Sequence, residues 1–175
     1  LIEWLERQRI QRLFLPVAAF SDLMRAAAET PMARLPLREI VCAGEQLVIS
    51  TAARDFFSRF PGCVLDNHYG PTETHAATAF RLTGAPEAWP VQAPIGSALP
   101  GTTLRILDEE LCPVSGGGAG ELWIGGDGLA TGYLNDPGLT AERFATVMVD
   151  GHPVRMYRSG DMVRTIEPGV LAFLG

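Results

Sequence analysis

Hydrophobic positions in the first part of the chain follow two alternating spacings. Residues 1–10 carry apolar side chains at the interval of one helix face, and the short apolar run at 13–15 is typical of a buried strand. Helical spacing then returns, and Pro16 is placed to begin the helix. The apolar residues that recur in this second helix are Val17, Phe20, Leu23, Met24 and Ala27.

The same alternation repeats as far as residue 67. Residues 38–43 resemble a strand that ends before Gly44, Ser50 is placed to cap a helix that runs to Phe60, and residues 63–67 resemble the next strand. Strands and helices that alternate at a period of about 25 to 30 residues are typical of βαβ units on a parallel sheet. We therefore expect an α/β fold class here.

The pattern changes after about residue 90. Short apolar runs separated by turns rich in Gly and Pro occupy residues 103–107, 121–124, 154–157, 162–165 and 170–174. Such a series is typical of antiparallel strands in a small barrel or sandwich. We expect residues 1–90 to form a parallel sheet with βαβ units, and residues 91–175 to form a small antiparallel β-barrel-like subdomain.

Composition and charge exclude several classes of function. The chain has 175 residues, 47% of them hydrophobic, and a net charge of −6; all 14 of its cations are Arg. An acidic chain without a basic cluster binds phosphate backbones and anionic lipid poorly, so we expect neither nucleic acid nor membrane as a partner. Three unevenly spaced Cys without zinc-ligand spacing favour free thiols and a cytoplasmic location.

Three expected strand ends are candidates for a binding site. In an open α/β sheet, ligands bind outside the carboxyl ends of the strands. These ends are at residues 15–17, 43–45 and 67–73, and parallel strands would bring them to one edge of the sheet.

The third of these loops carries the most side chains that could bind a ligand. Tyr69 offers a flat ring for a purine, Asn67 an amide that can read a base edge, and Thr72 a hydroxyl for phosphate. Glu73 supplies the hard oxygen that Mg²⁺ prefers, and Gly70 lets the backbone approach a ligand closely. Together these groups indicate a nucleotide site, although a plain strand-to-helix turn is compatible with the same residues.

Three motifs carry a resemblance to a known family. Residues 67–74, Asn-His-Tyr-Gly-Pro-Thr-Glu-Thr, resemble a core motif of the adenylation domains of nonribosomal peptide synthetases, in the superfamily that also holds acyl-CoA synthetases and firefly luciferase. Residues 120–134 resemble its Gly-Glu-Leu…Leu-Ala-x-Gly-Tyr stretch, and residues 157–161 resemble its Tyr-Arg-Thr-Gly-Asp motif with Ser for Thr. The resemblance covers essentially the whole chain and implies an internal part of the family's large N-terminal subdomain.

The resemblance also implies roles for individual residues. Tyr69 would stack on adenine, Asn67 would bind its exocyclic amine, and Asp161 would hold the ribose hydroxyls. Thr72 and Glu73 are implied as catalytic residues, Thr72 at the α-phosphate and Glu73 as the Mg²⁺ ligand. Four further residues complete the implied ATP and AMP site: Gly44, Glu45, His68 and Gly70.

An acyl pocket is implied in the same way. Its residues are Val17, Val41, Ala43, His68, Ala76 and Ala77. Five of the six are apolar, so a charged substrate side chain would lack a buried partner and we expect a neutral substrate. His68 could reverse this preference by pairing with an acidic group.

The implied reaction joins a carboxylic acid, expected to be an amino acid, to ATP and yields an acyl-adenylate. The implied cofactors are ATP, Mg²⁺ and phosphopantetheine, and the implied partners are the acid substrate and the carrier-protein and condensation domains of a larger synthetase. The glycines of residues 120–133 are expected to shape hairpins that hold Asp161, since no Lys is present to complete a phosphate-binding loop.

The missing Lys also limits what these residues can do alone. The family's phosphate loop would lie before Leu1, and Gly175 would lie at the hinge to a C-terminal subdomain, so we expect the 175 residues to be inactive in isolation. Two alternatives remain open, an acyl-CoA ligase and a non-catalytic nucleotide-binding module. A dinucleotide-dependent oxidoreductase is the weakest candidate, because no strand runs into G-x-G-x-x-G.

Overall fold

The chain forms two compact units in a computed structural model that describes residues 1–30 and 35–175. The first unit consists of Leu1–His68 and Phe80–Ala93, and the second of Tyr69–Ala79 and Pro94–Gly175. The expected division into residues 1–90 and 91–175 stays a prediction. Within the described residues, no helix is both long and apolar enough to cross a membrane.

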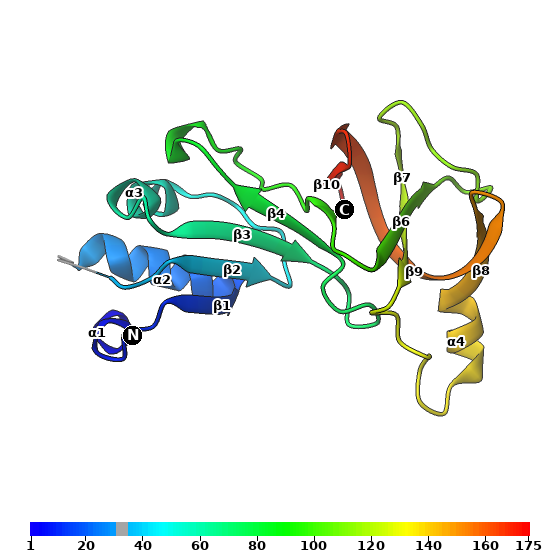
Figure 1. The fold of residues 1–175 in the computed structure, drawn as a ribbon, viewed down its shortest axis with the longest axis horizontal. Coiled ribbons are helices and arrows are strands. Elements are labelled where there is room, and N and C mark those ends of the chain that lie inside the picture. Colours follow the sequence, from blue (N-terminus) through cyan, green and yellow to red (C-terminus); the bar gives the residue numbers. More distant parts are fainter. Residues whose placement is uncertain (31–34) are drawn as a thin grey trace. The chain divides into compact units, whose positions relative to one another are not determined.

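The first unit is built on three parallel strands, which lie next to one another in Figure 1. Their register places Leu15 opposite Cys42 and Cys42 opposite Asn67. The expected βαβ arrangement is therefore confirmed. The elements are α1 (Ile2–Arg7), β1 (Arg12–Pro16), α2 (Val17–Glu29), β2 (Glu39–Ala43), α3 (Thr51–Arg59), β3 (Val64–Tyr69) and the short 3₁₀ helix η1 (Pro86–Ala88).

The helices bury the apolar faces that the sequence pattern predicts. The buried residues of α2 are Val17, Phe20, Leu23, Met24 and Ala27. Ser50 caps α3, because its hydroxyl accepts the Ala53 amide hydrogen at 3.2 Å. Phe56 and Phe57 of α3 are almost fully buried, and Phe57 packs against Trp89 with ring centroids 5.2 Å apart. This core fixes the carboxyl ends of β1, β2 and β3.

The second unit is dominated by an antiparallel sheet of strand order β10-β9-β7-β6, with β8 paired to β9. The other sheet has the order β1-β2-β3-β4-β5, and its strands β4 and β5 pair antiparallel. The sequence pattern did not predict β4, η1, β5, α4 or β8. The bounds are β4 (Thr78–Leu82), β5 (Ser97–Ala98), β6 (Thr102–Leu107), β7 (Ala119–Gly126), α4 (Pro137–Arg143), β8 (Phe144–Val149), β9 (His152–Glu167) and β10 (Val170–Phe173).

Strand β9 differs from the expectation of two separate strands at 154–157 and 162–165. It is one strand of 16 residues whose register against β7 shifts in its middle. Opposite the single residue Leu122, β9 carries Ser159, Gly160 and Asp161. Such a β-bulge bends a strand and redirects a side chain, and here it includes the last three residues of the motif at 157–161.

The loop after β3 folds tightly back on itself. The Ala77 amide donates to the Tyr69 carbonyl at 2.8 Å, and the Thr74 amide donates to the Pro71 carbonyl at 3.0 Å. A Cβ atom on Gly70 would overlap the His75 carbonyl oxygen. Only glycine fits at this point of the loop, so Gly70 is required by the fold itself.

Gly70→Ala tests this close approach. A backbone atom cannot yield as a flexible side chain can, so we expect the substitution to lower the free energy of unfolding by about 3 kcal/mol, at the upper end of ordinary overpacking. The measurement is urea unfolding of the purified protein.

The matched control is Gly138→Ala in α4. A Cβ there would meet the Asp136 carboxylate at an ordinary 3.6 Å, and alanine favours a helix over glycine. We expect this variant to be as stable as the wild type or more so. Equal stability of the Gly70 and Gly138 variants would contradict the proposed role of Gly70.

Candidate nucleotide-binding site

Tyr69 and Asp161 meet in the second unit although 92 residues separate them in the chain. Tyr69 ends β3, and Asp161 stands on the bulge of β9. The Tyr69 hydroxyl donates to Oδ2 of Asp161 at 2.5 Å. Burial, followed by this hydrogen bond, raises the pKa of Tyr69 well above its ordinary value, so the phenol stays protonated.

The neighbouring strand β7 holds the bulge in place. The Ser159 hydroxyl donates to the Leu122 carbonyl at 2.6 Å and accepts the Asp161 amide hydrogen at 3.0 Å. The Gly160 amide donates to Oε1 of Glu121 at 3.0 Å. The geometry of Asp161 is thus set by Glu121 and Leu122, which lie near the start of the glycine-rich stretch at 120–134.

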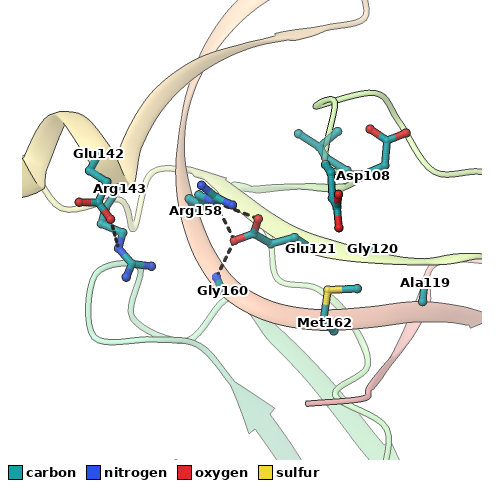
Figure 2. Close-up of a pocket in the computed structure, with 11 residues that line it drawn as sticks. Asp108, Ala119, Gly120, Glu121, Glu142, Arg143, Arg158, Gly160 and Met162 are labelled. Atoms are coloured by element: carbon teal, nitrogen blue, oxygen red, sulfur yellow. Dashed lines mark hydrogen bonds and ion pairs between the residues drawn. The ribbon is translucent and has the colours of Figure 1, made fainter.

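A polar pocket of about 590 Å³ borders this bulge and is drawn in Figure 2. Arg158 neutralises Glu121 there, with Nε 3.0 and 2.9 Å from the two carboxylate oxygens. Gly160 also lines the pocket, so the backbone just before Asp161 is accessible from solvent. The other lining residues are Leu107, Asp108, Glu109, Ala119, Gly120, Glu142, Arg143 and Met162.

Glu73 lies in a second polar cluster of the same unit. Its Oε1 accepts a hydrogen bond from the Tyr133 hydroxyl at 2.5 Å. Burial acts to raise the pKa of Glu73, but hydrogen bonds from Tyr133 and Tyr157 and the charge of Arg143 outweigh it, and the net pKa is lowered. Glu73 is therefore a carboxylate at neutral pH. Thr72, the preceding residue, is exposed.

Sequence reasoning missed Tyr133, Tyr157 and Arg143. Tyr133 belongs to a quoted motif, but the glycines around it suggested only a hairpin. The residue type was the one available signal, because the hydroxyl of a half-buried tyrosine usually has a hydrogen-bond partner. Nothing in the local pattern could show that this partner is Glu73, 60 residues earlier.

The remaining expected nucleotide-site residues lie in the first unit. Gly44 has a φ of +97° directly after β2, a conformation that favours glycine, and Glu45 is exposed. Asn67 is 2% exposed, and His68 is half-buried. The His68 ring lies edge-on to Phe14, with ring centroids 6.2 Å apart.

The six expected acyl-pocket residues are divided between the two units. Val17 is buried in the core of the first unit, and Ala77 is buried in a core of the second. Val41, Ala43 and Ala76 are half-buried, as is His68. Their role in substrate selection stays a prediction.

Comparison with known proteins gives a consistent result. The sequence profile of a family described as AMP-binding enzyme matches residues 1–134. Malpibaldin synthetase from Mortierella alpina is 42% identical over 179 residues, a match that covers 100% of this chain and 3% of that protein. A dimodular nonribosomal peptide synthase from Bacillus subtilis strain 168 is 39% identical over 163 residues, covering 90% of this chain and 7% of that protein.

Solved structures agree with the sequence relatives. PA1221, an NRPS protein containing adenylation and PCP domains, matches with a TM-score of 0.88 at 30% identity, over 99% of this chain and 34% of that one. The N-terminal subdomain of Klebsiella oxytoca NpsA in complex with 3-hydroxybenzoyl-AMSN matches with a TM-score of 0.81 at 26% identity, over 99% of this chain and 43% of that one. The chain thus spans a small part of its relatives' length, and it belongs to the AMP-binding enzyme family.

Proposed function

We propose that these residues form the adenosine-binding part of an adenylation domain, which activates a carboxylic acid with ATP as an acyl-adenylate. The observation that carries this proposal is the hydrogen bond between Tyr69 and Asp161. It joins the two motif residues to which the resemblance assigns the adenine and the ribose. If either residue only formed part of a turn, that turn would not need a contact with the other residue.

The two residues suit the two halves of adenosine. The Tyr69 ring packs against an apolar cluster that includes Ala77, Ile95 and Leu122 while the residue remains half-buried, so it offers a fixed aromatic face to a base. Asp161 uses Oδ2 for Tyr69, which leaves Oδ1 to accept a ribose hydroxyl. Asn67, Gly44 and Glu45 keep the adenine roles that the resemblance implies, and His68 and Gly70 stay in its implied nucleotide-site set.

Glu73 fits the role of Mg²⁺ ligand. A single hard carboxylate suits Mg²⁺, which commonly takes one or two carboxylates together with substrate phosphates and water. Bound there, Mg²⁺ would offset the negative charge of the ATP phosphates. Thr72, exposed beside Glu73, would donate to a phosphate oxygen.

An amino acid is the favoured substrate, and a carrier protein is the favoured partner. The two sequence relatives bear the names of a synthetase and of a nonribosomal peptide synthase, and one structural neighbour contains adenylation and PCP domains. These names favour transfer to the phosphopantetheine thiol of a carrier over an acyl-CoA ligase or a non-catalytic module. The apolar residues Val17, Val41, Ala43, Ala76 and Ala77 favour a neutral side chain.

Asp161→Ala tests the ribose assignment in the complete protein. Loss of a charge-assisted hydrogen bond is expected to raise the KM for ATP roughly 10- to 100-fold. ATP–pyrophosphate exchange at varied ATP concentration is the measurement. Asp150→Ala, at an exposed residue that pairs with Arg105 in the same unit, should leave the KM unchanged. An unchanged KM in Asp161→Ala would return Asp161 to a purely structural role.

Glu73→Gln tests the metal assignment. A neutral amide binds a hard cation weakly. The Mg²⁺ concentration that gives half-maximal exchange should therefore rise at least roughly tenfold, the smallest effect typical of mutating a residue that supports a metal ligand. Added Mg²⁺ should restore part of the rate. Exposed Glu167→Gln is the control and should change nothing. Equal loss of rate at every Mg²⁺ concentration would count against Glu73 as the ligand.

A further inference from the structure

We infer that Tyr133 is a positioning residue for Glu73, holding its Oε1 alongside the hydrogen bond from Tyr157, so that the carboxylate is presented in a fixed orientation to the metal complex of ATP. This inference rests on the proposed function. The Tyr133 hydroxyl lies 2.5 Å from Oε1 of Glu73. A carboxylate fixed through one oxygen loses less freedom when the second oxygen takes a ligand.

The ring of Tyr133 is itself held by aromatic packing. It lies edge-on to Phe144, with ring centroids 5.7 Å apart and an interplanar angle of 66°. Phe144 in turn packs against Tyr157 at 5.1 Å, and both Phe144 and Tyr157 are buried. The hydroxyl of Tyr133 therefore projects from a rigid support.

The backbone of Tyr133 is fixed to the start of α4. Its amide donates to the Thr140 hydroxyl at 2.9 Å, and this hydroxyl donates to the Asp136 carbonyl at 2.7 Å. Asp136 also caps α4, because its Oδ1 accepts the Leu139 amide hydrogen at 2.9 Å. Movement of Tyr133 would therefore break its hydrogen bond to Thr140 in the first turns of α4.

Arg155 of β9 ties the same loop to the antiparallel sheet. Its guanidinium donates to the carbonyls of Ala130 and Thr131 at 2.8 and 2.9 Å. It also lies over the Phe144 ring, 4.5 Å from the centroid. One cation thus holds both the loop backbone and the aromatic support of Tyr133.

The loop grips the backbone of Glu73 as well as its side chain. The Ala130 amide donates to the Glu73 carbonyl at 2.7 Å. A Cβ on Gly128 would lie 2.6 Å from the Thr74 carbonyl oxygen, so the two backbones approach too closely for any other residue. The motif at 120–134 therefore supports Glu73 directly, besides supporting Asp161 through Glu121.

Tyr133→Phe tests the inference, since it removes only the hydroxyl and keeps the ring on Phe144. The measurement is calorimetric ATP binding to the complete protein, once with Mg²⁺ and once with a chelator. We expect wild type to bind ATP more tightly with Mg²⁺ than without it, and we call this ratio of affinities the Mg²⁺ gain. In Tyr133→Phe the Mg²⁺ gain should be roughly tenfold smaller. Affinity for metal-free ATP should not change, because Asp161 and Tyr69 are untouched.

Two further variants separate positioning from general structure. Leu134→Ala, at an adjacent residue that is 91% exposed, should leave both affinities unchanged. In a Glu73→Gln background, Tyr133→Phe should have no additional effect on the Mg²⁺ gain, because the group that it positions is already altered.

The possible failures can be told apart. If Tyr133→Phe weakens ATP binding equally with and without Mg²⁺, or leaves the Mg²⁺ gain intact, the positioning role is wrong while the proposed function stands. If wild type binds ATP with no Mg²⁺ gain, the metal role of Glu73 fails. If wild type binds no ATP under either condition, the proposed function itself is wrong.

Discussion

The hydrogen bond from Tyr69 to Asp161 is the contact on which the candidate site depends. It forms only because the bulge in β9 places three residues opposite Leu122 and turns the Asp161 side chain toward Tyr69. The bulge is stabilised in turn by Glu121, which accepts the Gly160 amide hydrogen while Arg158 neutralises its charge. A short motif with little apparent chemistry of its own therefore fixes the geometry of the carboxylate that we assign to the ribose.

A second carboxylate, that of Glu73, is also held in place by hydrogen bonds from residues distant in the chain. Glu73 is held at its side chain by Tyr133, besides Tyr157 of β9, and at its backbone by Ala130. The supports from Tyr133 and Ala130 come from the loop that follows β7, the strand that also carries Glu121. One stretch of sequence thus positions two carboxylates, one assigned to the ribose and one to the metal. This dual role explains in physical terms why residues 120–134 combine glycines, which permit close backbone approach, with a tyrosine.

Much of the fold followed from hydrophobic periodicity. The first three strands and their helices were predicted because each buries one apolar face, as α2 does with Phe20 and Leu23. The continuity of β9 could not be predicted, since a bulge containing Ser159 and Gly160 looks like a turn to any local pattern. The residues assigned to adenosine were recognised from motifs, but the Tyr133 contact was missed because its partner lies 60 residues away.

A crystal structure of the complete protein with bound AMP is the most direct test of the roles of Tyr69 and Asp161. We expect electron density for the adenine against the Tyr69 ring and for a ribose hydroxyl within hydrogen-bonding distance of Asp161. Density for AMP that contacts neither residue, at full occupancy and with the Tyr69–Asp161 hydrogen bond intact, would contradict these roles.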